Sequence, residues 1–581
     1  MHTFRVWAPL AKDVLVVVNG MEHRMAAGES GWRSAAVGDA KPGDDYGFKI
    51  DGQGPFPDPR SAWQPKGVHG LSRLVDHSSF AWTDSHWQAP PLSSAILYEL
   101  HIGTFTPEGT LDAAIGKLDH LVDMGVTHVE VMPVNEFPGG RGWGYDGVDL
   151  YAPHHAYGGP EGLKRFVAAC HERNLAALLD VVYNHLGPSG NYLARFAPYF
   201  NPHYSTPWGP AINFDGPDSD EVRRFFCDNA LMWLRDYHFD GLRLDAVHAI
   251  VDTSAEPFLE QLGREVKELS AATGRHFVVI PESDLNDPRL LAAREAGGFD
   301  LDAQWSDDFH HGLHTVLTGE STGYYADFGS LADLAKALRQ AWVYDGCHSE
   351  HRRRRHGRPH KGLSGHRFLG YLQNHDQIGN RAKGDRSSQT MSAGKARIGA
   401  ALTLLSPFVP MLFQGEEWGA TTPFIYFTDH EDAELGKAVR DGRRSEFAAF
   451  GWKPEEIPDP QAAETFAKSK LNWGELKSAP HQAMLEWHKK LIQLRRSEPS
   501  LNYGRLELVN VQFDEDARWL TLERGPIIIA CNFQSSPQTV PLQSGKRALI
   551  LSSESDVALS DAGARLPGES VVVLRVGQNQ H

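Results

Sequence analysis

The sequence predicts an α/β protein built on a (β/α)8 TIM barrel, with an N-terminal and a C-terminal β-sandwich. Three observations support this fold class. Both ends of the chain contain short apolar runs separated by turn residues, the long middle part alternates strand-like runs with helix-like periodicity, and three of the middle runs end in an acid. Because such barrels place their active sites at the C-terminal ends of the strands, we expect these acids to share one pocket.

The size and charge of the chain narrow its function class. At 581 residues it exceeds one ordinary domain, and 41% hydrophobic residues suit a globular protein with a large core. The formal net charge of -17 makes nucleic acids and anionic membranes poor partners. Four scattered cysteines predict neither a disulfide framework nor a zinc site, and no leader or membrane-spanning run is evident, so we expect a cytoplasmic protein.

Residues 1–90 are predicted to form the N-terminal β-sandwich, of immunoglobulin-like type. Residues 4–7 and 14–18 are short apolar runs, and turns rich in Asn, Gly and Pro follow them. Two consecutive prolines, Pro90 and Pro91, indicate the boundary with the next domain.

Residues 91–502 are predicted to form the barrel. After the first strand, Leu111, Ile115 and Leu118 recur at helical spacing, and another helix is predicted at about residues 162–173. Some 410 residues is long for a barrel of roughly 250 residues, so we expect long loop excursions such as residues 186–215. The eight predicted strands are residues 95–101, 128–134, 176–182, 241–245, 277–282, 301–305, 368–376 and 410–414.

Residues 503–581 are predicted to form the C-terminal β-sandwich. Its expected strands are residues 504–508, 527–530, 548–551 and 571–574. The basic run at residues 351–356 could indicate a nucleic-acid patch, but in an acidic chain it is better interpreted as a solvated surface loop.

Three acids carry the predicted chemistry: Asp245, Glu282 and Asp376. Glycosyl transfer needs one carboxylate at the anomeric carbon and one protonated carboxyl for the leaving oxygen. Arg243 lies on the same strand face as Asp245 and would keep that acid ionised. Glu282 follows the apolar pair Ile280 and Pro281, a setting that would raise its pKa and keep it protonated. These features, without metal-ligand spacing, favour glycoside chemistry.

Aromatic residues in the expected loops could stack on sugar rings. Each one alone is as easily explained by core packing, and the set is more persuasive than any member. The candidates are Trp143, Tyr145, Tyr151, Trp208, Trp305 and Trp418.

Four ordered motifs resemble the signature regions of the α-amylase family of glycoside hydrolases: residues 180–185 (DVVYNH), 241–245 (GLRLD), 281–283 (PES) and 374–376 (NHD). The resemblance implies that Asp245 is the nucleophile, Glu282 the acid/base and Asp376 the transition-state stabiliser. The family retains anomeric configuration, so the carboxyl groups of Asp245 and Glu282 should lie about 5–5.5 Å apart. The implied substrate contacts are Tyr145, His185, Arg243, Asn374, His375 and Gln377.

Further stretches resemble the maltooligosyltrehalose trehalohydrolases, one branch of that family. This branch would hydrolyse the α-1,4 bond next to the trehalose end of its substrate, with trehalose in the plus subsites. Asp307 and Asp308 are interpreted equally well as helix-capping residues. The matching stretches are residues 101–110, 143–148, 305–311, 413–419, 423–430 and 443–452. The further substrate contacts that the resemblance implies are His248, Asp307, Asp308, Phe309, His310 and His311.

The resemblance also implies the ligands of the protein. We expect no cofactor and no metal ion. The expected partners are maltooligosyltrehalose and related α-glucans, without nucleic acid, membrane or an obligate protein partner.

Three alternatives remain open on the sequence. A 1,4-α-glucan branching enzyme would use the same acids, although residues 424–430 argue against it. A pullulanase-like or general α-amylase activity would differ only in the α-glucan bond that is cleaved. A noncatalytic, transporter-associated member of the family would be expected to lose catalytic acids and to carry a membrane span, and this chain keeps all three acids.

Overall fold

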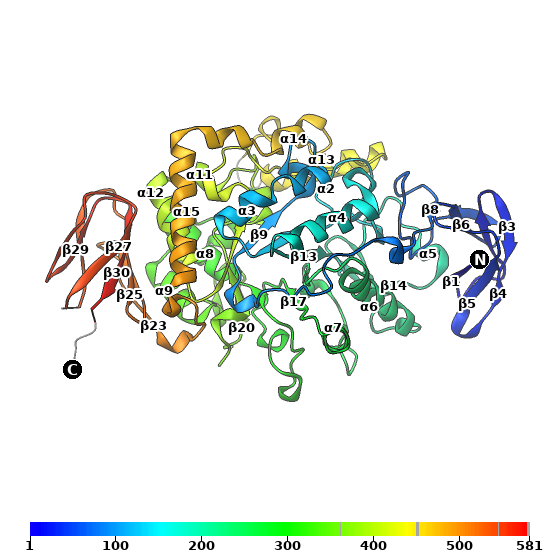
Figure 1. The fold of residues 1–581 in the computed structure, drawn as a ribbon, viewed down its shortest axis with the longest axis horizontal. Coiled ribbons are helices and arrows are strands. Elements are labelled where there is room, and N and C mark those ends of the chain that lie inside the picture. The colour runs from blue at the N-terminus through cyan, green and yellow to red at the C-terminus, as the bar shows by residue number, and fades with distance from the viewer. Residues whose placement is uncertain (361, 449–451, 544, 578–581) are drawn as a thin grey trace.

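The computed structural model describes residues 1–360, 362–448, 452–543 and 545–577. Figure 1 shows an elongated molecule with a barrel in the middle and a small β unit at each end, so that the two chain termini lie far apart. The eight-stranded parallel sheet in the middle confirms the predicted fold class.

The N-terminal unit consists of two antiparallel sheets. Phe4, Val16 and Phe48 are buried between them, which follows from the alternation of buried and exposed side chains along the strands. Edge-to-face aromatic contacts join this unit to the barrel. The ring centres of Trp7 and Tyr199, for example, lie 5.5 Å apart. One sheet contains β1 (His2–Trp7), β5 (Trp32–Val37) and β4 (Ala26–Ala27). The other contains β3 (Met21–Arg24), β2 (Val14–Val18), β6 (Asp45–Ile50), β7 (Gln53–Phe56) and β8 (Ser72–Arg73).

The barrel strands pair in parallel in the order β17-β16-β13-β10-β9-β22-β21-β18. The ring closes between the ends of this order, where the Asp302 N–H donates to the Val279 carbonyl at 2.9 Å. Side chains such as Leu178, Ile280 and Met411 fill the interior. The strands are β9 (Leu97–Leu100), β10 (His128–Val131), β13 (Ala176–Val181), β16 (Gly241–Leu244), β17 (Val278–Pro281), β18 (Gln304–Trp305), β21 (Phe368–Gly370) and β22 (Val409–Phe413).

One strand prediction in the barrel needs correction. The seventh strand ends at Gly370, and Asp376 lies in the first turn of helix α10 (His375–Gly379) rather than at a strand end. The predicted first helix is likewise divided into α2 (Leu111–Ile115) and α3 (Leu118–Met124), since Gly116 ends the first piece.

Helices surround the barrel (Figure 1), and their apolar side chains are buried. In α4, for example, Leu163, Phe166 and Val167 are buried at helical spacing. The longer helices are α4 (Gly159–Glu172), α6 (Ser219–Asp236), α7 (Phe258–Thr273), α8 (Asp307–Thr318), α9 (Leu331–Gln340), α12 (Ala393–Leu404), α13 (Ala433–Ala448) and α15 (Ala479–Ser497). The short ones are α1 (Ile102–Phe105), α5 (Leu193–Phe196), α11 (Ser387–Thr390) and α14 (Ala463–Ser469). No helix in the described part of the chain is long and apolar enough to cross a membrane.

Hairpins extend from the loops of the barrel. They are β11 (Asn135–Glu136) with β12 (Asp149–Pro153), β14 (Phe200–Thr206) with β15 (Gly209–Ile212), and β19 (Asp345–Ser349) with β20 (Arg354–Gly357). The basic run at residues 351–356 lies on the last hairpin and is only partly solvated, because His356 is buried and Arg352 forms a 2.9 Å ion pair with Asp284.

The C-terminal unit again has two antiparallel sheets, with Ile528, Val540 and Val572 buried in a common core. Residues 506–508 form a 3-10 turn instead of the predicted strand, and the first strand begins at Val509. One sheet contains β23 (Val509–Asp514), β24 (Trp519–Arg524), β25 (Ile527–Asn532), β30 (Ser570–Val576) and β27 (Arg547–Ser552). The other contains β26 (Gln538–Pro541), β29 (Gly563–Leu566) and β28 (Ala558–Ser560).

Candidate active site

Arg243 is the centre of a cluster of acids at the mouth of the barrel. Its Nη1 donates to Asp180 Oδ2 at 2.6 Å and to Asp245 Oδ1 at 2.9 Å. Its Nη2 lies 2.8 Å from Glu282 Oε2. The guanidinium also lies over the ring of the buried Trp305, 4.3 Å from the ring centre, and this contact helps to hold it in place. Three neighbouring strands therefore bring three carboxylates to one cation.

Glu282 has the electrostatic setting of a proton donor. Burial raises its pKa, and the charges of Asp245 and Asp376 raise it further, against the opposing effect of Arg243. The Ala246 N–H donates to Glu282 Oε2 at 2.7 Å and holds the side chain in place. Arg243 contacts Asp245, in agreement with their predicted place on one strand face, and the same guanidinium also contacts Glu282.

The position of Asp376 is set by helix α10. Asn374 caps this helix, and its Oδ1 accepts from the N–H groups of Asp376 at 2.9 Å and Gln377 at 3.1 Å. Asn380, one turn later, donates from Nδ2 to Asp376 Oδ1 at 2.6 Å. The helix start thus aims the Asp376 carboxylate at the mouth of the barrel.

Tyr145 and His375 form a second part of the site. The Tyr145 hydroxyl lies 2.6 Å from Asp180 Oδ2 and 2.8 Å from His375 Nε2, and the two rings stack at 5.2 Å. Glu99 accepts from the His375 backbone N–H at 3.0 Å and pairs with Nδ1 of the same residue. Burial lowers the pKa of His375, but Glu99 outweighs it and the pKa lies above its usual value.

Tyr145, Asp245, His375 and Asp376 border a cavity of about 640 Å³. Its volume is in the range of small-molecule sites. The barrel mouth, the β14–β15 hairpin and helix α13 all contribute walls. The lining includes Trp143, Tyr145, Asp146, His185, Trp208, Asp245, His375, Asp376, Asn380, Tyr426, Arg443 and Glu446.

The aromatic candidates divide into two groups. Trp143, Tyr145 and Trp208 line the cavity, and the His185 ring stacks on Trp208 at 5.2 Å. Tyr151, Trp305 and Trp418 are buried and do not line it. Trp208 is 49% exposed, which leaves its ring surface open beside the cavity.

Sequence reasoning missed two acids that organise the site, Glu99 and Asp180. Glu99 holds His375, and Asp180 links Arg243 to Tyr145. Burial raises the pKa of Asp180 to about 7, against the effect of Arg243. Both lie in predicted strands, so the pattern of an acid near a strand end, which found Asp245, could also have found them.

Asp307 and Asp308 are adjacent in the sequence, but their side chains bind different partners. Asp307 accepts from the Tyr371 hydroxyl at 2.5 Å, and burial together with the Glu282 charge raises its pKa to about 8. Asp308 Oδ2 accepts instead from the backbone N–H groups of Val343 at 2.6 Å and Tyr344 at 2.8 Å. Asp307 therefore lies near Glu282, while Asp308 holds the backbone at Val343 and Tyr344 by hydrogen bonds.

The remaining predicted contacts lie outside the large cavity. Phe309 is fully buried against Phe408. His310 is also buried, 2.8 Å from both the Leu372 carbonyl and the Tyr325 hydroxyl. The predicted site residues that do not line that cavity are Arg243, His248, Glu282, Asp307, Asp308, Phe309, His310, His311, Asn374 and Gln377.

Two of these residues still approach other open surfaces. His248 is exposed, with Nδ1 4.0 Å from Asp284 Oδ1. The His311 ring stacks at 5.2 Å on Tyr324, which lines a second cavity of about 570 Å³. Asn380 borders both cavities. The second cavity therefore adjoins the first beside Asp376.

The motif at residues 443–452 begins on α13, where Arg443 lines the cavity. Residues 449–451 of this motif lie outside the described residues.

The Asn184 side chain is engaged within the protein. Its Nδ2 donates to the Asp245 carbonyl at 2.7 Å and to Asp245 Oδ2 at 2.8 Å, while Oδ1 pairs with His185. The side chain thus orients Asp245.

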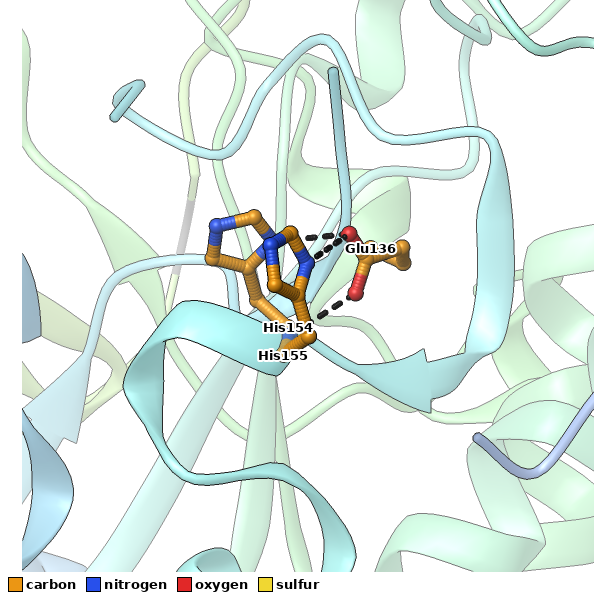
Figure 2. A group of neighbouring side chains, drawn as sticks. All are labelled: Glu136, His154 and His155. Carbon is orange, nitrogen blue, oxygen red and sulfur yellow. Dashed lines mark hydrogen bonds and ion pairs between the residues drawn. The ribbon is translucent and has the colours of Figure 1, made fainter. Parts of the chain in front are cut away.

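Among the residues that the structure describes, one group has donors that a metal ion could use: Glu136, His154 and His155. Figure 2 shows both imidazole rings turned toward the carboxylate. Glu136 Oε1 lies 3.1 Å from His154 Nδ1 and 2.7 Å from His155 Nδ1, and Oε2 accepts from the His155 N–H at 2.8 Å. Two histidines and a carboxylate suit zinc in type, but here the ligand atoms bond to one another.

Comparison with known proteins supports the family that the motifs indicate. Residues 75–206 match the α-amylase catalytic domain, and residues 504–573 match a domain of unknown function. A malto-oligosyltrehalose trehalohydrolase from Rhizobium sp. (strain M-11) is 48% identical, with 98% of this chain and 97% of the relative covered. One from Mycobacterium tuberculosis (strain H37Rv) is 49% identical, with both chains covered completely.

A solved structure extends the likeness to the whole fold. The crystal structure of a putative α-amylase from Salmonella typhimurium superposes with a TM-score of 0.91 at 38% identity, covering 99% of this chain and 97% of that one. The chain therefore belongs to the malto-oligosyltrehalose trehalohydrolases of the α-amylase family.

Proposed function

We propose that this protein is a retaining glycoside hydrolase that cleaves the α-1,4-glucosidic bond next to the trehalose end of maltooligosyltrehalose and releases trehalose. One observation carries the proposal: a single guanidinium, Arg243, contacts both Asp245 and Glu282, and Asp245 lines the same cavity as Asp376. Full-length relatives with the corresponding name support the choice of substrate.

In the first step, Asp245 attacks the anomeric carbon while Glu282 gives its proton to the glycosidic oxygen. The bond from that carbon to the oxygen breaks, trehalose leaves with the proton, and a covalent glycosyl-enzyme remains. The bonds from Arg243 and Asn184 support an ionised, oriented Asp245. The raised pKa of Glu282 supports a protonated acid.

In the second step, Glu282 accepts a proton from water, and the resulting hydroxide attacks the same carbon and displaces Asp245. Two inversions give overall retention. Asp376 would stabilise the positive charge that develops on the sugar ring in both transition states. This mechanism requires the carboxyl groups of Asp245 and Glu282 to lie about 5–5.5 Å apart.

The substrate would lie with its maltooligosaccharide part in the cavity of about 640 Å³. Tyr145, His185 and His375 would contact the sugar at the cleavage point, and Trp208 would offer its exposed ring for stacking. The trehalose part would extend past Glu282, toward Asp307 and His248. Asp307 supports this direction because the charge of Glu282 contributes to its raised pKa, so the two carboxyl groups are neighbours.

A product assay on two substrates of equal length tests the proposal. Purified protein is given maltooligosyltrehalose or the matching reducing maltooligosaccharide, and the products are separated and quantified. Free trehalose from the first substrate, with little cleavage of the second, is the expected result. Equal cleavage of both would mean a general α-glucan hydrolase, and longer branched products would mean a branching enzyme.

A further inference from the structure

Helix α13 forms a wall of the catalytic cavity, although it lies outside the barrel strands. Val439, Gly442, Arg443 and Glu446 of this helix line the cavity. Arg443 extends from α13 to the end of α10, the helix that carries Asp376. Its Nη2 donates to the Gly379 carbonyl at 2.6 Å and its Nη1 to Asn380 Oδ1 at 3.0 Å.

The Arg443 side chain is firmly held. Its guanidinium lies 4.8 Å from the ring centre of Tyr426 and 4.8 Å from that of Phe447. The side chain is only 13% exposed. A guanidinium held by two aromatic rings and two hydrogen bonds keeps a constant position relative to Asn380.

Arg443 determines which way the Asn380 amide points. A guanidinium has only donors, so the amide oxygen must face Arg443. The amide nitrogen must then face the opposite partner, which is Asp376 Oδ1 at 2.6 Å. Asp376 engages only the nitrogen end of the amide, so without Arg443 the oxygen end would lose its donor and the Asn380 side chain could rotate together with the carboxylate.

We propose that Arg443 is a positioning residue that fixes the Asp376 carboxylate through the oriented Asn380 amide. This inference rests on the proposed function, because it assumes that Asp376 acts on the transition state. It assigns to α13 a role in catalysis that is separate from enclosing the substrate. A carboxylate that is free to rotate would contribute less in the transition state while binding the substrate nearly as well.

Kinetic constants of four variants test the proposal, measured on whichever α-glucan the unaltered enzyme cleaves. Arg443→Met should lower kcat about tenfold to a hundredfold with KM nearly unchanged. Arg443→Lys keeps a group with donors only, so it should recover most of the lost kcat. The double variant Arg443→Met with Asn380→Ala should be no slower than Asn380→Ala alone, because both act through one contact.

Arg440→Met is the matched control. Arg440 lies on the same helix but points to Asp459 at 3.4 Å, away from α10, so kcat should stay at the unaltered value. If Arg443→Met folds poorly, Asn380→Asp still tests the idea with Arg443 in place. It removes the donor and adds a negative charge beside Asp376, so it should be slower than Asn380→Ala.

Three outcomes would overturn the proposal: a rise in KM alone for Arg443→Met, multiplying losses in the double variant, or Arg443→Lys as slow as Arg443→Met. The identity of the product from the unaltered enzyme is a separate readout. An enzyme that releases no trehalose would contradict the proposed function, while the ratios between variants would still decide the role of Arg443.

Discussion

Two buried groups in this molecule bring carboxylates and cations together, and they are balanced in opposite ways. In the first, Asp180, Asp245 and Glu282 share the single guanidinium of Arg243. In the second, the single carboxylate of Glu136 is shared by two imidazoles and a backbone N–H (Figure 2). The first has an excess of acids, and the second has an excess of donors.

The difference is visible in the pKa values. Burial raises the pKa of Glu136, but His154 and His155 outweigh it, so the pKa lies below its usual value. The pKa of Glu282 lies above its usual value, because burial and two neighbouring acids outweigh Arg243. An excess of acids therefore leaves one of them able to hold a proton for transfer, whereas an excess of donors produces a fixed contact.

The Glu136 group also supports the active site, although it lies outside it. Glu136 lies before the loop that contains Trp143 and Tyr145, and His154 and His155 lie after it. Their bonds close the base of this loop, so Tyr145 is held where it contacts Asp180 and His375. We therefore expect substitutions in the first group to affect catalysis and those in the second to affect stability.

The largest expected effect is on catalysis. Asp245→Asn, Glu282→Gln and Asp376→Asn should each lower kcat by about three orders of magnitude or more, because each removes a charge or proton that the reaction uses. Initial rates with purified variants provide the measurement. Thermal unfolding is the control, and the midpoints should stay within a few degrees of the unaltered protein, since isosteric changes leave the packing intact. Near-normal turnover by Glu282→Gln would contradict its assignment as the acid.

The second effect is on stability. Glu136→Ala should lower the free energy of unfolding by about 3 kcal/mol, because it leaves the buried imidazole of His154, the partly buried imidazole of His155 and an N–H without their acceptor. Denaturant unfolding measures this change. At a temperature where the variant is folded, its kcat should fall far less than that of Asp245→Asn. A stable but inactive Glu136→Ala protein would contradict the expectation that the Glu136 group serves stability and the Arg243 group serves catalysis.

A smaller effect concerns the pH dependence of stability. The folded-state pKa of Asp307, raised to about 8, lies above the ordinary value of about 4 for an unfolded chain. The folded protein thus holds a proton that the unfolded chain releases, so stability contributed by this group is present below about pH 4 and is lost as pH rises through about 8. Asp307→Asn cannot release a proton and should show a shallower fall of the unfolding midpoint between these values. Parallel curves for the two proteins would show that Asp307 ionises normally.

The last prediction concerns metal removal, for which we expect no effect. If the Glu136 group is closed by its own hydrogen bonds, dialysis against a chelator should change neither kcat nor the unfolding midpoint. Metal analysis of the untreated protein, with the Glu136→Ala variant as the matched control, completes the measurement. A midpoint that falls on dialysis and recovers with zinc would mean that the group binds a metal ion instead.

The barrel, and two of the three acids in their places, follow from the local sequence. Asp245 and Glu282 follow apolar runs that form strands, and the end of a strand is a property of the local chain. The sequence also indicated the family, because four motifs occur in the expected order. Asp376 was identified from the sequence, but its place in a helix was not, since the strand already ends at Gly370 and Asn374 then caps α10.

Only the tertiary structure decided which groups meet. Asp180 and Arg243 are 63 positions apart, and their contact exists because β13 and β16 are neighbours in the closed sheet. The neighbours Asp307 and Asp308 look alike in the sequence, yet one joins Tyr371 near the acids and the other binds the backbone at Val343. Periodicity is a property of the backbone along the chain, whereas charge balance at a site depends on side chains that folding brings together.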